Sequence, residues 1–130
     1  MKIQKSSEDY LEMILMLREK KGYARSIDIA SELSVTKPSV SYATKRLREN
    51  GYITMDSDGL IALTESGYEI AYRMYMRHKM LTAFLMSIGI DEETAREDAC
   101  KMEHDISDKS FDAMCGLTQW TQDNKERFDS

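Results

Sequence analysis

Three side chains that commonly bind transition metals lie close together in the last third of the sequence. Cys100, Glu103 and His104 are spaced i, i+3 and i+4, and on an α-helix this spacing places all three side chains on one face. A thiolate, a carboxylate and an imidazole are suitable ligands for a divalent transition metal. The spacing therefore predicts one part of a metal site.

Further potential ligands lie in two other segments. Asp9 and Glu12 are three residues apart in a segment with helical periodicity, and His78 lies in the middle of a second such segment. If all of these side chains converged in a helical bundle, they would form a transition-metal site. Its carboxylate oxygens suit Mn(II) or Fe(II), whereas the sulfur favours Fe(II), Zn(II) or Co(II).

Each of these residues also has an ordinary structural interpretation. Asp9 could belong to a capping box, Glu12 could be a surface charge and Cys100 a small buried hydrophobic residue. His78 could lie at the rim of a domain. The metal hypothesis therefore depends on convergence in space, and Cys115, which has no ligand at helical spacing, is assigned to packing.

A second group of residues, between positions 36 and 48, could contact DNA. Small hydroxyl side chains at the start of a helix let its backbone approach the major groove, and cations on the outer face neutralise phosphates. The alternative is an ordinary solvated helix face, but the flanking elements favour DNA. The predicted DNA-binding residues are Thr36, Lys37, Pro38, Ser39, Ser41, Tyr42, Lys45, Arg46 and Arg48.

The elements around this group predict a winged helix-turn-helix. Helical periodicity runs over residues 7–20 and 26–33, with Ser6 and Asp9 as a capping pair for the first helix. A third helix has Pro38 in its first turn and ends at Asn50 and Gly51. Two β-rich runs, 52–55 and 60–64, flank a turn that contains glycine and form the wing.

The rest of the chain is predicted to be entirely helical. One helix runs from about residue 64 to 87, and a second is capped by Asp91 and reaches about Ile106. A last helix begins near Ser107, before a polar stretch at 121–130 that should fray. The predicted fold is mainly α, with a winged helix-turn-helix DNA-binding domain at 1–66 and a metal-binding and dimerisation domain at 67–130. The apolar residues available for a dimer interface are Phe84, Leu85, Ile88, Phe111, Met114, Leu117 and Trp120.

Charge is distributed unequally between these two halves. The chain has 130 residues and a net charge of −5, yet residues 1–50 carry 10 basic and 7 acidic side chains and residues 51–130 carry 8 and 16. The basic half can meet an anion and the acidic half a cation. A 42% hydrophobic content excludes a disordered chain. Without a secretory signal or a membrane-length apolar run, we expect a cytoplasmic protein with free cysteines.

The order of these motifs resembles the diphtheria toxin repressor family of metal-dependent transcriptional regulators. The resemblance rests on the Ser-Glu-Asp-Tyr-Leu-Glu helix, Lys-Gly-Tyr-Ala-Arg, the helix-turn-helix with Pro-Ser-Val, the wing, Arg-His-Lys and Cys-x-x-Glu-His. It covers nearly all of residues 5–120 and is greatest for the manganese transport regulator branch, in a two-domain form without a C-terminal barrel.

The resemblance implies a metal site, a partner and a function. Its ligands would be Asp9, Glu12, His78, Glu103 and His104, binding one or two Mn(II) or Fe(II) ions per protomer. Cys100 stands where the manganese branch is expected to have a bridging glutamate and the iron branch a cysteine. A homodimer would bind a palindromic operator in double-stranded DNA and repress metal-uptake genes.

Two other functions remain open at this point. A metalloenzyme could use the same ligands, although no nucleophile or general base accompanies them. A metal-binding winged-helix interaction module could have lost DNA binding, although the three cations Lys45, Arg46 and Arg48 argue against it. We therefore expect a regulator that is not an enzyme and has neither an organic substrate nor a membrane partner.

Overall fold

The computed structural model describes residues 4–123, with side chains as far as Leu117. This part of the chain divides into two compact units, one that ends at Tyr75 and one that begins at Met76. A domain boundary between residues 66 and 67 stays a prediction. In the range described, no helix has the length and the apolar character needed to cross a membrane.

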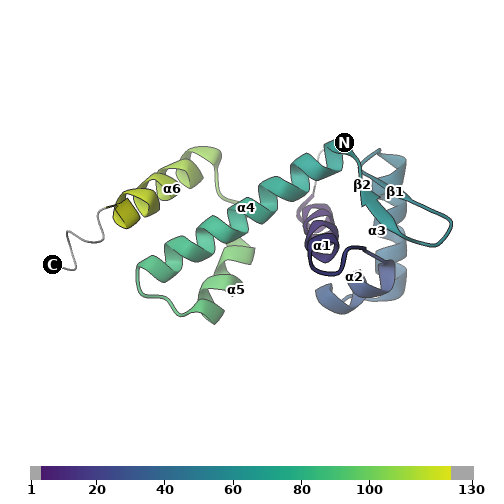
Figure 1. The fold of residues 1–130 in the computed structure, drawn as a ribbon, viewed down its shortest axis with the longest axis horizontal. Coiled ribbons are helices and arrows are strands. Elements are labelled where there is room, and N and C mark those ends of the chain that lie inside the picture. The colour runs from purple at the N-terminus through teal and green to yellow at the C-terminus, as the bar shows by residue number, and fades with distance from the viewer. Residues whose placement is uncertain (1–3, 124–130) are drawn as a thin grey trace. The chain divides into compact units, whose positions relative to one another are not determined.

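The first unit has the predicted winged helix-turn-helix, with three helices followed by a hairpin (Figure 1). The hairpin is an antiparallel pair in which Thr54 lies opposite Ala62. The structural elements are α1 (Lys5–Lys21), α2 (Ser26–Leu33), α3 (Lys37–Glu49), β1 (Ile53–Met55), β2 (Ile61–Leu63) and the first part of α4 (Glu65–Ser87). The predicted fold class is confirmed.

The core of this unit forms where the apolar faces of its elements meet. Leu11 and Ile14 recur on one face of α1 and are fully buried, together with Val40 and Leu47 of α3 and Ile61 of β2. Burying a leucine or isoleucine side chain contributes about 1.5–3 kcal/mol. The core therefore fixes which face of α3 points outward.

Local sequence signals set both ends of α3. The Thr36 hydroxyl accepts a hydrogen bond from the Ser39 backbone N–H at 3.3 Å, so Thr36 is the N-cap, and proline lies in the first turn. The helix closes at Asn50, and Gly51 follows with φ +77°, a left-handed conformation that glycine adopts without strain. These predictions are confirmed.

The wing is attached to the helices by backbone carbonyl groups. The Arg25 side chain donates a hydrogen bond to the Asp58 carbonyl at the tip of the wing, at 2.8 Å. Arg18 donates to the Ile61 carbonyl at 2.9 Å, and the Ile61 N–H donates to the Ala24 carbonyl. The wing is therefore held against α1 and the segment that leads into α2.

The start of α4 lies directly against the chain that enters the wing. A Cβ atom at Gly67 would lie 2.0 Å from the Tyr52 carbonyl oxygen. Only glycine allows this approach, because the obstacle is backbone.

The second unit contains the end of α4, α5 (Glu92–Met102) and α6 (Asp108–Asp123). Gly89 ends the preceding segment with φ +100°, and the Asp91 carboxylate accepts a hydrogen bond from the Thr94 N–H at 3.0 Å. The predicted cap of α5 is confirmed. Ala95 and Ala99 are fully buried and form the inner face of α5.

Two predicted helix ends are wrong. The first helix begins at Lys5 with Gln4 as its N-cap and no side-chain cap, so Ser6 already lies inside the helix and cannot cap it. The fifth helix ends at Met102 and does not reach Ile106, because the chain turns after Met102. The side chain of Trp120 and residues 124–130, where fraying was predicted, lie outside the described residues.

Candidate metal centre and nucleic-acid interface

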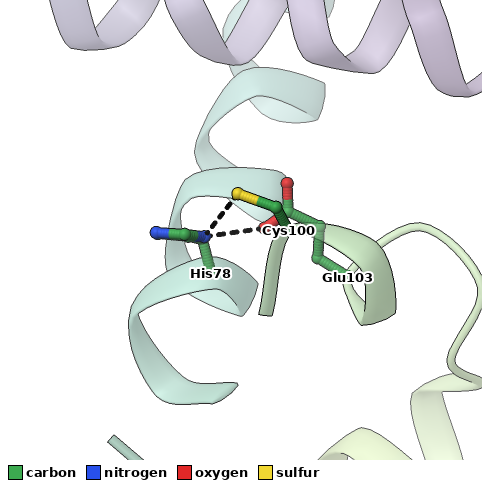
Figure 2. A group of neighbouring side chains, drawn as sticks. All are labelled: His78, Cys100 and Glu103. Carbon is green, nitrogen blue, oxygen red and sulfur yellow. Dashed lines mark hydrogen bonds and ion pairs between the residues drawn. The ribbon is translucent and has the colours of Figure 1, made fainter. Parts of the chain in front are cut away.

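His78, Cys100 and Glu103 converge within the second unit (Figure 2). His78 projects from α4, Cys100 from the last turn of α5 and Glu103 from the C-cap of α5. His78 Nδ1 lies 3.6 Å from Cys100 Sγ and 3.2 Å from Glu103 Oε2. One nitrogen, one sulfur and one oxygen atom, all within 4.8 Å of one another, suit a transition-metal ion.

The three side chains differ in their access to solvent. Glu103 is only 1% exposed, whereas the side chain of His78 is 19% exposed and Cys100 is exposed. A buried carboxylate needs a positive partner, because burial removes its hydration. The exposed thiol leaves the cluster open on one side.

The imidazole supplies the positive partner. Hydrogen bonds to Cys100 and then to Glu103 raise the pKa of His78 to about 10, although burial acts in the opposite direction. These contacts favour the protonated, positively charged imidazole. A divalent ion that binds here would take the place of that proton, and the donor set fits such an exchange.

His104 lies on the other side of the same carboxylate. Its Nε2 atom is 3.4 Å from Glu103 Oε1, and its side chain is 2% exposed. The two oxygens of Glu103 therefore face two different imidazoles. The i, i+4 spacing had suggested that His104 lies on the helix, but His104 lies in the turn after α5.

Asp9 and Glu12 lie in the first unit, about one turn apart on α1. Glu12 is 7% exposed and Asp9 is half-buried. Burial of an acidic residue is uncommon unless it is paired. It stays a prediction that Asp9 and Glu12 bind a metal ion together with the residues of the second unit.

All nine predicted DNA-binding residues are exposed. The opposite face of α3 is buried through Val40, Thr44 and Leu47, and the Thr44 hydroxyl donates to the Val40 carbonyl at 2.8 Å. The helix therefore presents its polar face to solvent, as recognition by a groove requires.

Arg46 and Tyr42 form an exposed pair of contacting side chains on this face. The Arg46 guanidinium donates to the Tyr42 hydroxyl at 3.0 Å and lies 5.7 Å from the centre of its ring. This contact raises the pKa of Arg46 further. A hollow of about 280 Å³ adjoins the pair and is also lined by Ser6 and Ser7 of α1 and by Ser39. This hollow was not predicted from the sequence.

Sequence reasoning also missed Arg77. Met74 and Leu81 of α4 are 2% and 1% exposed, and Arg77 lies between them on the same helical stripe at 3% exposed. Met74 and Leu81 are seven residues apart and lie on one face of the helix, and Arg77, three residues after Met74, lies on the same face. A cation on a buried helix face is unusual unless it has partners, and this was the signal that was missed.

Comparison with known families accounts for both halves of the chain. Residues 2–61 match the family described as the iron dependent repressor, N-terminal DNA binding domain. Residues 64–124 match the iron dependent repressor, metal binding and dimerisation domain.

Individual relatives agree with this. The chain is 39% identical over 122 residues to the HTH-type transcriptional regulator MntR of Bacillus velezensis, covering 94% of this chain and 86% of that protein. Among solved structures it is similar to IdeR of T. acidophilum, with a TM-score of 0.78 and 29% identity over 90% of this chain. It is also similar to the manganese regulator SloR, with a TM-score of 0.77 and 28% identity over 92% of this chain. The chain spans 55% of the length of each of these two solved chains.

Proposed function

The chain belongs to the iron-dependent repressor family of metal-dependent, DNA-binding transcriptional regulators, and from this premise we propose that Mn(II) or Fe(II) controls its binding to DNA. The observation that carries the proposal is the convergence of His78, Cys100 and Glu103 on one point of the second unit. In this proposal the protein acts in the cytoplasm and represses genes for metal uptake.

The proposed ligands offer three kinds of donor atom. The oxygens suit Mn(II), while the sulfur of Cys100 shifts the preference toward Fe(II). The positions of Glu103 between two imidazoles and of Cys100 beside His78 support one ion in the second unit, and a second ion would need the carboxylates of α1. The full proposed set is Asp9, Glu12, His78, Cys100, Glu103 and His104, for one or two ions per protomer.

Control of DNA binding would come from the two carboxylates on α1. Asp9 and Glu12 carry negative charges on a helix whose other face builds the core of the DNA-binding unit. A divalent cation supplies positive charge that lets carboxylates from both units lie close together. If Asp9 and Glu12 bound the same cation as Glu103, the cation would hold α1 at the second unit.

The α3 face supports DNA as the partner. Its exposed hydroxyl groups lie at the start of the helix, where base edges are contacted, and Lys45, Arg46 and Arg48 lie further along, where phosphates are contacted. By linkage, metal and DNA would raise each other's affinity equally, typically by about 1–3 kcal/mol.

A homodimer would match a palindromic operator. Two recognition helices about 34 Å apart meet successive major grooves on one side of DNA. The second unit exposes Met86, Ile88 and Leu117, and exposed apolar side chains of this size suit a contact between two copies. Two-fold symmetry of the protein then requires two-fold symmetry of the operator.

The decisive experiment measures DNA binding with and without metal. Duplexes are selected from a random pool with the chelated protein and with the same protein after anaerobic addition of Mn(II) or Fe(II). We expect selection only with metal, and the selected duplexes should contain inverted half-sites. Equal DNA binding in the chelated and metal-loaded samples would overturn the proposal.

A matched pair of variants tests the cluster. Glu103→Gln should abolish the response to metal, because it removes the charge that faces both imidazoles. Glu97→Gln changes an exposed glutamate of the same helix and should respond like the unaltered protein.

The same experiment tests the alternatives. A winged-helix interaction module would bind metal but select no duplex. A metalloenzyme is not favoured, because the family consists of transcriptional regulators.

A further inference from the structure

Arg77 is buried in the second unit and has several partners. Its Nη1 atom donates hydrogen bonds of 2.9 Å to the carbonyl oxygens of both Glu103 and Ile106. Its Nη2 atom donates to the carboxylate of Asp108, the first residue of α6, and its guanidinium lies 5.2 Å from the ring centre of Phe111. One side chain of α4 therefore contacts the end of α5 and the start of α6.

These contacts explain why α5 ends where it does. The last carbonyl groups of a helix have no partner within the helix. Arg77 supplies one to the C-cap residue Glu103 and to Ile106 beyond it. A buried carbonyl left without a donor costs free energy, so the turn after Met102 depends on the guanidinium.

Glu103 is consequently held at both of its ends by neighbouring residues of α4. Arg77 binds its backbone carbonyl at 2.9 Å, and His78 contacts its carboxylate at 3.2 Å. Consecutive side chains on a helix point about 100° apart, so they approach Glu103 from different directions. The backbone hydrogen bond fixes the main chain from which the Glu103 side chain projects, and the contact with His78 fixes where its carboxylate lies.

The ion pair with Asp108 does not by itself explain why a charge is buried here. Taking a charge out of water costs free energy, and an ion pair offsets that cost only when its geometry is good and the remaining donors are satisfied. Arg77 is 3% exposed, whereas its anionic partner Asp108 has a side chain that is 74% exposed. What an apolar residue could not supply is a donor that fixes two carbonyl groups beside a cluster of ligands.

We propose that Arg77 is a positioning residue for the metal centre, which fixes the turn after α5 so that the Glu103 carboxylate stays in place between His78 and His104. The inference rests on the proposed metal site. Residues that orient metal ligands without touching the metal commonly change affinity by about 10–100-fold when they are replaced.

The test compares Arg77→Gln and Arg77→Lys with the unaltered protein. Affinity for Mn(II) and Co(II) is measured by competition with a chelator, and the absorption bands of the Co(II) form report the ligand geometry. We expect Arg77→Gln to bind both metals about 10–100-fold more weakly with altered bands. Arg77→Lys keeps the charge and can donate to one carbonyl, so it should recover part of the loss.

A matched control uses the other arginine of this region. Arg96 lies on α5, has a 65% exposed side chain and forms an ion pair with Glu92, one turn earlier on the same helix. Arg96→Gln removes the same charge from the same unit and should leave affinity and spectrum unchanged.

The outcomes separate this inference from the proposed function. If the unaltered protein binds neither metal, the proposed function fails. If Arg77→Gln lowers the thermal midpoint but binds with unaltered affinity and spectrum, Arg77 is only structural and the inference is overturned. If Arg77→Gln does not fold, Asp108→Asn decides: it leaves the arginine in place without its anion and should weaken metal binding in the same direction, and unaltered binding would overturn the inference.

Discussion

The face of α3 and the cluster around Glu103 place their polar groups in opposite surroundings. Every predicted DNA contact on α3 is exposed, whereas Glu103 is 1% exposed with an imidazole at each oxygen. Water screens exposed charges, so they contribute little to stability. Buried polar groups depend on their partners, and removing one partner disturbs the fold. Substitutions on the face of α3 should therefore change DNA binding without changing stability. Substitutions in the cluster around Glu103 should change both metal binding and stability.

The largest effect that would test this contrast is expected at the cations of α3. Replacing Lys45, Arg46 and Arg48 together by glutamine removes three phosphate contacts. The slope of log affinity against log salt should fall by about 2.7, which corresponds to about 100-fold weaker DNA binding near 0.15 M salt. Metal affinity and the thermal midpoint should stay unchanged, because all three side chains are exposed.

The control removes three exposed cations from the second unit, Arg96, Lys101 and Lys109. It changes the net charge equally but leaves the α3 face intact, so DNA binding should fall much less. Equal losses in the two triple variants would mean that overall charge, and not the α3 face, determines affinity for DNA.

A smaller effect is expected from Cys100→Glu in the metal centre. The change replaces a soft sulfur donor by a hard oxygen donor, at a residue that is exposed although its neighbour Glu103 is buried. The ratio of Mn(II) to Fe(II) affinity should rise on the order of tenfold. Anaerobic competition titrations with each metal measure the ratio.

Cys115→Ser is the matched control for this variant. Cys115 is the second free cysteine, and burial raises the pKa of its thiol. Its replacement should leave the ratio of the two affinities unchanged. An unchanged ratio in Cys100→Glu as well would show that Cys100 is not a ligand.

The same contrast explains how much of the fold and the α3 face could be predicted. Thr36, Pro38 and Gly51 act on their immediate neighbours, so sequence spacing was sufficient to define α3 and the face it exposes. The wing followed from a local pattern of two β-rich runs around Gly59, which has φ +80°. Short-range interactions of this kind are visible in a sequence.

The metal centre depends on contacts between residues far apart in the chain. The spacing of Cys100 and Glu103 suggested a shared face, but their meeting with His78 joins positions 22 and 25 residues apart. The end of α5 was misjudged because its carbonyl partner, Arg77, lies 26 residues upstream of Glu103. Helical periodicity carries no information on which buried cation will meet which carbonyl.

The smallest effect is expected at Asp91, an exposed residue of the second unit. It tests whether the effect of a substitution is determined by the exposure of the side chain or by the unit in which the residue lies. Asp91 lies in the second unit but is as exposed as the α3 face. Asp91→Ala removes the cap of α5 and should lower the thermal midpoint by roughly 3 °C. Metal affinity at neutral pH should change little, because the cap lies at the opposite end of α5 from Glu103.

The dependence on pH gives this prediction its sign. The hydrogen bond from the Thr94 N–H lowers the pKa of Asp91 below its ordinary value of 3.8. Its contribution to stability is therefore complete above pH 3.8 and is lost as the pH falls through the lower pKa of the folded state. Asp91→Asn keeps a capping oxygen that does not titrate, so thermal unfolding from pH 7 to acid should show a shallower loss in this variant than in the unaltered protein. If both proteins lost stability in parallel, the cap would not be charged in the folded protein. If Asp91→Ala strongly lowered metal affinity, the exposed cap and the buried cluster of the second unit would be coupled, and the contrast between exposed and buried groups would fail.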